Sequence, residues 1–421
     1  MNRAFLKALS LIAAAVTAAG AAGCGKKEDK AQSKAETPSG TGYVINKNDD
    51  VVSCRAEDEN FDIYTSNTYL STGNNGIVKS AENVAYRAFI PVEEYGELEY
   101  CFYFSNTVDS TYNTGDKAWV GEPGGEYEII SAAVYHCSDP ESEPEGRTEV
   151  TFGGSAGKTV SPDETFWSDP VTIDVPEGSY LVWEWVINGE QIPCNKMANL
   201  TSCGMMEVEY DDEFKYTDDV PLPVFIGAKR SAVTERITAV GDSITQGCQT
   251  EYMKFEYWAA GIAQGLGEEC SFYNAGLGWA RLSDLAEENN WLGRSLNCDT
   301  AIIAFGTNDI ISGEYGGDGG NTADEIADYL CSVLDQFKAA GVEKIIVFTA
   351  PPQDYGEEEE AVRLRYNEIV PEVCAAYGAQ CFDFASYLCD PETPATAKYG
   401  GHPNGEAGAI VAKAFLEEYG Y

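Results

Sequence analysis

The sequence predicts an all-β sandwich over residues 43–225, followed over residues 234–421 by an α/β domain whose parallel sheet has helices on both faces. Two observations indicate this order. Before Pro223, many short strand-like runs are separated by turns rich in Gly, Pro, Asn and Asp, which is typical of a sandwich. After Pro223, apolar runs alternate with helix-like segments, which is typical of a parallel sheet. At 421 residues, the chain is long enough for two such cores.

The first region contains five clear strand-like runs: Tyr86–Val92, Glu97–Phe104, Tyr127–Cys137, Pro170–Val175 and Tyr180–Ile187. Trp183 and Trp185 fall on one face of the last run, because side chains two residues apart share a face of a strand. We expect both indoles to pack in the core rather than to form a platform for sugars. His136 lies in the run that ends at Cys137 and is expected to be structural or exposed.

The second region alternates five apolar runs with four helix-like segments. The runs are Arg236–Val240, Ser271–Tyr273, Thr300–Phe305, Lys344–Thr349 and Gln380–Phe384, and the helix-like segments are Lys254–Gly265, Ala323–Ala340, Glu358–Tyr377 and Glu406–Tyr419. Ser243, the loop at Asn274 and Asn308 follow the first three runs. Because ligands of such sheets bind beyond the carboxyl ends of the strands, we expect these three sites on one rim.

The first 24 residues read as an export signal. Arg3 and Lys7 accompany an apolar run that is too short for a comfortable transmembrane helix. The run ends in Ala21-Ala-Gly-Cys24, which resembles a bacterial lipobox with Cys24 as the lipidated residue, although Leu is usual at the position of Ala21. Residues 25–42 are polar and predict a flexible tether. We expect a lipid-anchored protein on the bacterial cell surface, with a cleaved signal and secretion as the alternative.

The composition limits the partners and cofactors. The formal charge of −42 argues against nucleic acid and against anionic membrane surfaces, so any membrane contact is expected through the lipid anchor alone. The negative charge either serves solubility alone or, as the more specific interpretation, gives a preference for neutral over anionic polymers as substrates. Thirteen cysteines leave twelve if Cys24 carries lipid; export permits disulfides, with the pairing open. No His/Cys cluster has metal-ligand spacing, and we expect neither a metal nor another cofactor.

The candidate chemistry centres on Gly241-Asp-Ser-Ile-Thr-Gln-Gly247. A serine hydroxyl needs a positioned base before it attacks a carbonyl at neutral pH, and imidazole is the usual base. The chain has two histidines, and only His402 lies in the same half as Ser243. It stands in the loop Gly400-Gly-His-Pro-Asn404, just before the last helix-like segment. Ser243 and His402 are therefore the predicted nucleophile and base.

Four motifs in the second region resemble the blocks of the SGNH (GDSL-type) hydrolases. They are Gly241-Asp-Ser243, Asn274-Ala-Gly276-Leu-Gly278, Gly306-Thr-Asn-Asp309 and His402-Pro-Asn404, similar to the first, second, third and fifth blocks. The resemblance covers Thr234 to Tyr421 and implies a flavodoxin-like parallel sheet and serine esterase activity. Gly178–Ile187 is similar, less specifically, to the jelly-roll front domain of certain SGNH carbohydrate esterases. An all-β jelly-roll sandwich is therefore expected in front of the hydrolase domain.

The resemblance also implies roles for single residues. Ser243 attacks the carbonyl, and His402 takes up its proton and returns it to the leaving alcohol. Three donors would bind the oxyanion: the Ser243 backbone N–H, a backbone N–H of the second block and the Asn308 amide. The family usually places Gly where this chain has Trp279; the glycine one position earlier, Gly278, is the predicted second donor. The alternative for Asn308 and Asp309 is a turn or a helix cap.

One departure concerns the third member of a triad. The family usually carries Asp three residues before the catalytic His, and this chain has Tyr399 there. A phenol is neutral at pH 7 and replaces a carboxylate poorly. Asp383 or Asp390 is a candidate replacement. A backbone carbonyl is the alternative, because some jelly-roll SGNH carbohydrate esterases work as Ser-His dyads.

Together these patterns predict an exported serine esterase that removes acetyl groups from a polysaccharide. A lipase or lysophospholipase is one alternative, although no loop predicts the extended apolar groove that long acyl chains need. The other is a carbohydrate-binding surface protein with a degenerate hydrolase domain. Tyr399 favours this last reading, and the intact Ser243, Asn308 and His402 argue against it.

Overall fold

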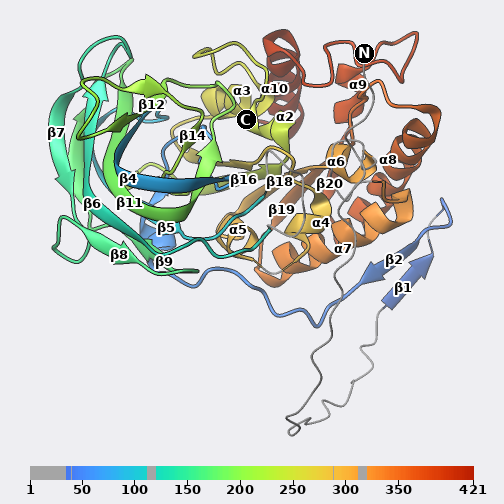
Figure 1. Ribbon diagram of the computed structural model, residues 1–421. Helices are drawn as coiled ribbons and strands as arrows, with labels where there is room; N and C mark the ends of the chain where they lie inside the picture. Colours follow the sequence, from blue (N-terminus) through green and yellow to red (C-terminus); the bar gives the residue numbers. More distant parts are fainter. Residues whose placement is uncertain (1–34, 39, 111–119, 288, 312–319) are drawn as a thin grey trace, which may run out of the picture. The chain divides into compact units, whose positions relative to one another are not determined.

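The computed structural model describes residues 35–421 except for residues 39, 111–119, 288 and 312–319 (Figure 1). The predicted signal of residues 1–24, with Cys24, lies outside the described residues. Of the predicted tether, Ala35–Pro38 form strand β1, which pairs antiparallel with β2 (Val44–Lys47). Residues 34–421 form one compact unit.

Two antiparallel sheets make up the β-rich region, as expected for a sandwich. One sheet has the order β10-β5-β15-β3, with β9 beside β5; the other has the order β13-β12-β4-β11-β6-β7, with β14 beside β11 and β8 beside β6. A single helical turn, α1 (Asn60–Ile63), precedes them. The strands are β3 (Thr65–Ser66), β4 (Gly76–Ile90), β5 (Gly96–Ser105), β6 (Tyr127–Cys137), β7 (Glu145–Val150), β8 (Lys158–Val160), β9 (Thr165–Trp167), β10 (Val171–Val175), β11 (Tyr180–Lys196), β12 (Cys203–Glu207), β13 (Lys215–Tyr216), β14 (Asp219–Val220) and β15 (Phe225–Ala228).

The core of this region forms around β11. Trp183 is 0% exposed and Trp185 2% exposed, so the prediction that both indoles pack in the core is confirmed. Their rings contact each other and Phe104 of the facing sheet. The strand was predicted to end at Ile187 but continues to Lys196 through an irregular register at Gly189. Only glycine fits there, because a Cβ atom would lie 2.5 Å from the Cβ of Tyr127.

Five parallel strands form the sheet of the second region. They are β16 (Glu235–Gly241), β17 (Cys270–Gly276), β18 (Thr300–Ala304), β19 (Lys344–Phe348) and β20 (Gln380–Phe382), in the spatial order β17-β16-β18-β19-β20. In chain order this is 2-1-3-4-5, the flavodoxin-like arrangement, which confirms the predicted fold class. The order reverses between β16 and β18. Ligands of such folds bind at the carboxyl ends of the strands on either side of that point.

Helices cover both faces of this sheet (Figure 1). Alternate residues of a strand point to opposite faces, and they fall into two different apolar clusters. Ile302 and Ile346 belong to the cluster with α3 (Trp258–Gly265) and α10 (Gly405–Tyr419); Ile303 and Val347 belong to the cluster with α7 (Ala323–Ala339) and α8 (Glu357–Tyr377). The remaining helices are short: α2 (Ser243–Gln246), α4 (Leu282–Leu285), α5 (Asn290–Ser295), α6 (Thr307–Ile310) and α9 (Phe384–Leu388).

Two further features belong to the described part of the chain. Its twelve cysteines form no disulfide with one another. Within the same ranges, every helix is too short or too polar to cross a membrane.

Candidate active site

Ser243 stands where the first parallel strand turns into a helix. β16 ends at Gly241, Asp242 caps the helix by accepting a hydrogen bond from the Ile244 N–H (2.9 Å), and Ser243 is the first residue of α2. The turn is tight: a Cβ atom on Gly241 would lie 2.0 Å from the Thr245 hydroxyl. As the first residue of a helix, Ser243 has a backbone N–H with no acceptor inside that helix.

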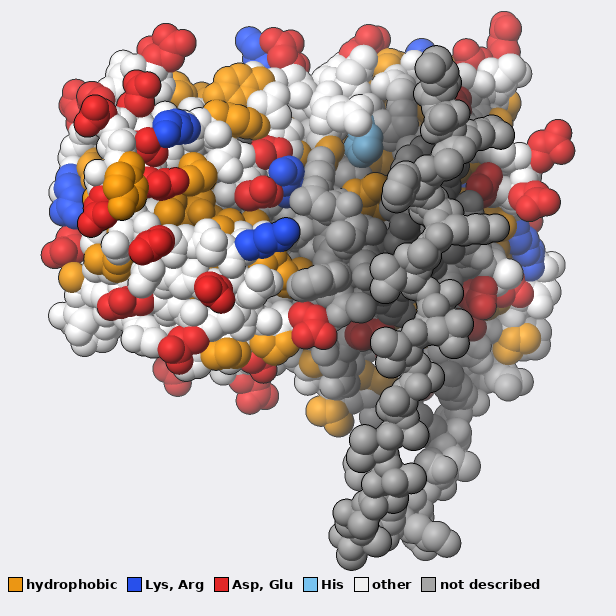
Figure 2. Space-filling model, in the orientation of Figure 1, with side chains coloured by type: hydrophobic (Ala, Val, Ile, Leu, Met, Phe, Trp, Pro, Cys, Tyr) orange, Lys and Arg blue, Asp and Glu red, His pale blue; other side chains and the backbone are white. Residues whose placement is uncertain are grey.

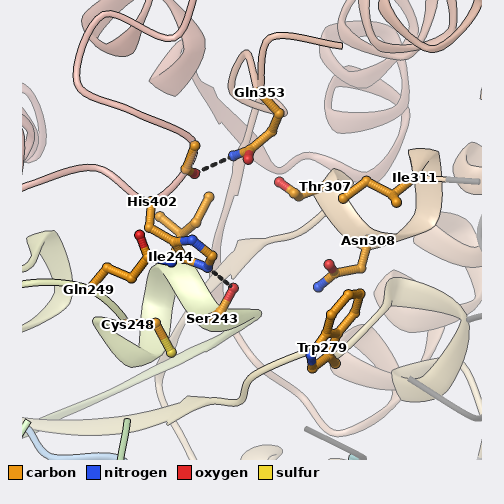
Figure 3. Close-up of a pocket in the computed structure, with 11 residues that line it drawn as sticks. Ser243, Ile244, Cys248, Gln249, Trp279, Thr307, Asn308, Ile311, Gln353 and His402 are labelled. Atoms are coloured by element: carbon orange, nitrogen blue, oxygen red, sulfur yellow. Dashed lines mark hydrogen bonds between the residues drawn. The ribbon is translucent and has the colours of Figure 1, made fainter. Parts of the chain in front are cut away.

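His402 reaches Ser243 from the loop before α10. Asn404 caps that helix by accepting from the Ala407 N–H (3.1 Å), and the Gln353 amide donates to the Gly401 carbonyl (2.5 Å). Both bonds hold the short loop that carries the imidazole. The Nε2 atom of His402 lies 2.8 Å from Oγ of Ser243 (Figure 3). The structure therefore brings the predicted nucleophile and base, 159 residues apart in the chain, into hydrogen-bond contact.

The electrostatics suit a base. Burial lowers the pKa of His402 below its ordinary value of 6.5, so the imidazole is neutral at neutral pH. A neutral ring has one nitrogen that can accept a proton, and Nε2 faces the serine hydroxyl. Among the described residues, the only hydrogen bond of the imidazole is the one between Nε2 and Ser243.

The two candidate third members of a triad bind elsewhere. The Asp383 carboxylate accepts a hydrogen bond from the Thr349 hydroxyl (3.3 Å). Asp390 accepts from the backbone N–H groups of Glu392 (2.8 Å) and Thr393 (3.2 Å) in its own turn, and these bonds lower its pKa. The ring of Tyr399 lies under the ammonium of Lys398 and packs against the core. The structure thus brings neither aspartate to His402.

The third block contributes two side chains with different tasks. Asn308, in α6, lines the cavity and donates one amide hydrogen bond to the Ala280 carbonyl (2.9 Å). An amide has two N–H groups, so one remains for a ligand. Asp309 is fully buried and accepts from the N–H groups of Leu282 (2.9 Å) and Ser283 (3.2 Å). Asp309 is therefore a helix cap, the alternative considered for this pair, and it fastens the third block to α4 beside the second.

The second block differs from the prediction. The Gly278 N–H donates to the side-chain oxygen of Gln246 (2.8 Å), and Gly278 does not line the cavity. Its N–H is thus already used by the protein. Trp279 lines the cavity instead, with a backbone φ of +64° that bulky residues rarely adopt. Trp279, rather than Gly278, is therefore the second-block residue at the cavity.

A cavity of about 400 Å³ joins these residues. In Figure 3, Ser243 and His402 lie on one side and Asn308 and Trp279 on the other. The other described residues that line the cavity were not predicted as site residues; they are Ile244, Cys248, Gln249, Thr307, Ile311, Gln353 and Gly401. Ile244 and Thr307 adjoin motif residues, so proximity in sequence was a usable signal for them. No sequence signal could have identified Gln353, because it follows the strand β19 without any recognisable motif.

Burial also affects the carboxylate beside the serine. The pKa of Asp242 is raised to about 7, chiefly by burial, with a smaller contribution from the nearby Asp309 charge. Asp242 faces the Ile244 N–H, so its role in this structure is to cap α2.

The described residues contain no group of three His, Cys, Asp or Glu side chains that could hold a metal ion.

Comparison with protein families agrees with this geometry. Residues 239–410 match the GDSL-like lipase/acylhydrolase family, a stretch that begins in β16, ends in α10 and contains Ser243, Asn308 and His402. The chain carries a GDSL-family hydrolase domain. Its parallel sheet and the strand-to-helix turn at Ser243 are the parts of the GDSL-family domain that present the serine at the sheet edge.

Several solved structures are similar to this chain. A lipolytic protein of the G-D-S-L family from Veillonella parvula is 19% identical, covering 44% of this chain and 98% of its own, with a TM-score of 0.35. An acetylxylan esterase from Geobacillus stearothermophilus is 22% identical (46% and 97%, TM-score 0.35). A GDSL-like lipase from Parabacteroides merdae is 17% identical (45% and 96%, TM-score 0.38). No curated protein matches this sequence.

Proposed function

We propose that this protein is a serine esterase that removes acetyl groups from a neutral polysaccharide through Ser243 and His402. The observation that carries the proposal is the 2.8 Å contact between Nε2 of His402 and Oγ of Ser243 at the edge of the parallel sheet. A buried neutral imidazole in this contact can accept the serine proton as the hydroxyl attacks.

The chemistry has two steps. Ser243 Oγ attacks the ester carbonyl, His402 takes up the hydroxyl proton, and the Asn308 amide and the Ser243 N–H stabilise the oxyanion. When the tetrahedral intermediate collapses, the sugar oxygen leaves with the proton from His402, and the acetyl group stays on Ser243. Water, deprotonated by His402, then attacks the acyl enzyme; the bond to Ser243 Oγ breaks, acetate leaves, and His402 returns the proton to Ser243.

The walls of the cavity favour a small acyl group on a sugar. A volume of about 400 Å³ lies at the small end of the range of small-molecule sites, roughly 300–1,000 Å³. Among the described residues that line it, none is Lys or Arg, so this part of the site offers no cation to a phospholipid phosphate. Gln249, Gln353 and Thr307 offer amide and hydroxyl groups, which hydrogen-bond sugar hydroxyls. These features support a glycan ester over a lipid ester.

The protein's charge fits a neutral polymer. The formal charge is −42, and Figure 2 shows acidic side chains spread over the visible face and few basic ones. Such a surface repels polyanions. An acetylated neutral glycan carries no charge that this surface would oppose.

The cell surface is the proposed location. The sequence Ala21-Ala-Gly-Cys24 after an apolar run supports lipidation at Cys24, and acyl chains would hold the enzyme at the membrane. The variant Cys24→Ser should release the protein or stall its processing. Wild-type protein found wholly in the medium, with its N-terminus beyond Cys24, would contradict this location.

A substrate panel tests the proposed function. Acetylated xylan, acetylated mannan, 4-nitrophenyl acetate and a long-chain aryl ester are assayed with wild-type enzyme, Ser243→Ala and His402→Ala. The proposal expects acetate release from at least one glycan, little activity on the long-chain ester, and loss of nearly all activity in both variants. A fully active Ser243→Ala enzyme would rule out the serine mechanism, and preference for the long-chain ester would favour a lipase.

A further inference from the structure

A loop of the β-rich region reaches the second block of the hydrolase domain. Ser110, which follows β5, is fully buried, and its hydroxyl donates a hydrogen bond to the Gly278 carbonyl (2.9 Å). The two residues are 168 positions apart. Gly278 immediately precedes Trp279, which lines the cavity opposite Ser243.

This bond acts on the peptide group between Gly278 and Trp279. A peptide bond is planar and trans, so its C=O and N–H point in opposite directions. Because Ser110 holds the Gly278 oxygen, the N–H of Trp279 is directed away from Ser110. Rotation of this one peptide group would change the direction of both atoms together.

The Ser110 loop is itself firmly anchored. The N–H groups of Asp109 (2.8 Å) and Ser110 (3.1 Å) donate to the Asn74 carbonyl. The Asp109 carboxylate accepts from the Asn74 N–H (2.8 Å) and from the guanidinium of Arg294 in α5 (3.0 Å). Asp109 and Arg294 are 1% and 0% exposed, so this ion pair is closed to solvent. The loop therefore connects the β-rich region rigidly with the hydrolase domain.

A second contact holds the same peptide segment from the serine side. Gln246, in the helix that begins at Ser243, accepts from the Gly278 N–H (2.8 Å) and donates to the carbonyl of Lys196 at the end of β11 (2.9 Å). Gly278 is thus held through its oxygen by Ser110 and through its nitrogen by Gln246. Both contacts depend on the β-rich region, one directly and one through Lys196.

We infer that the β-rich region positions the oxyanion site, with Ser110 as a positioning residue that orients the Trp279 N–H toward the oxyanion formed at Ser243. This inference rests on the proposed esterase function. It gives the β-rich region a task in catalysis in addition to any contact with a polymer. These hydrogen bonds link the first three motifs. Gln246, in the helix that begins at Ser243, holds Gly278, and Asp309 caps the helix that follows Trp279.

The test compares Ser110→Ala with Asn290→Ala. Asn290 is a matched control because its amide donates to the Thr107 hydroxyl (3.3 Å), a bond that also joins α5 to the loop after β5 but includes no residue of a block. For 4-nitrophenyl acetate, Ser110→Ala should lower kcat about tenfold with KM unchanged, less than the 10²–10³ lost when a donor is removed altogether. The Ki of phenylboronic acid, which forms a tetrahedral adduct with the serine, should rise by a similar factor. Asn290→Ala should keep kcat and Ki.

Thermal unfolding of both variants separates catalysis from stability. The inference expects similar Tm values for the two variants beside different kcat values. A wild-type kcat in Ser110→Ala, or an equal loss in Asn290→Ala, would overturn it while Ser243→Ala remains inactive. A fully active Ser243→Ala enzyme would instead overturn the proposed function, so the two failures are distinct.

Discussion

His402 contacts Ser243 at 2.8 Å, Nε2 to Oγ, without a carboxylate at its other ring nitrogen in the described residues. In a triad, an acid holds the imidazole in the correct tautomer and stabilises its charged form. Here the ring is held by packing and by the loop bonds of Gln353 and Asn404. The described geometry is that of a Ser-His pair.

Neither candidate acid should be essential. Asp383→Asn and Asp390→Asn should each lower kcat less than tenfold, about 1.4 kcal/mol in the barrier, because both carboxylates bind elsewhere. Converting a true triad acid to its amide can cost on the order of 10⁴. Steady-state kcat for both variants distinguishes these cases, and a loss near the larger figure in a folded variant would identify a triad.

The activity should fall only at acidic pH, because the midpoint of the acid side of the kcat/KM profile should lie below 6.5. The active base is neutral His402, whose pKa is lowered below 6.5 by burial, so kcat/KM should rise with pH and level off near neutrality. Asp242, with a pKa of about 7, could add a second step, and the profile is therefore measured in Asp242→Asn as well. A midpoint above pH 7 in that variant would show that a negative charge supports the imidazolium.

Asp242 should make stability depend on pH. Its folded pKa of about 7 exceeds the ordinary 3.8, so its contribution to stability is complete below about pH 4 and is lost as pH rises toward 7. Asp242→Asn keeps an acceptor for the Ile244 N–H but no longer titrates. The free energy of unfolding of this variant, relative to that of wild type, should therefore be higher at pH 8 than at pH 5 by on the order of 2 kcal/mol. Urea unfolding at both values checks this, and a constant difference would refute it.

Trp279 should separate small esters from glycans. Trp279→Gly removes the indole but suits the φ of +64°, so the backbone should persist. We expect kcat on 4-nitrophenyl acetate within about threefold of wild type and a KM for acetylated oligosaccharides raised about tenfold, because aromatic faces pack against sugar rings. Trp279→Ala is the comparison: it also removes the indole but keeps the Cβ atom that wild type already carries at this φ, so it should show the same loss on oligosaccharides. Equal losses on both substrates in Trp279→Gly would contradict a role in glycan binding.

Local patterns were sufficient to predict much of the fold and site. The change from short alternating runs to strand-helix repeats predicted the antiparallel sandwich and the parallel sheet after it, and polar residues after the first and third parallel strands marked Ser243 and Asn308. Their position at a strand end follows from chain direction alone. The extension of β11 past Ile187 was missed because Gly189 reads as a turn, whereas here it permits close strand packing.

Contacts between distant segments could not be predicted. Gln246 and Ser110 bind backbone atoms of Gly278, and a backbone acceptor leaves no mark in the sequence. Gly278 was predicted as a donor because the family usually carries Gly one position later, but a side chain 32 positions earlier occupies its N–H. Such bonds depend on how the chain folds back, which periodicity does not specify.

The most direct test of the Ser-His account is covalent labelling of the intact enzyme with a fluorophosphonate, followed by peptide mapping. The account predicts one label per chain, located on Ser243, loss of esterase activity in proportion to labelling, and at least a hundredfold slower labelling of His402→Ala. A label on another residue, or full activity after Ser243 is labelled, would contradict it.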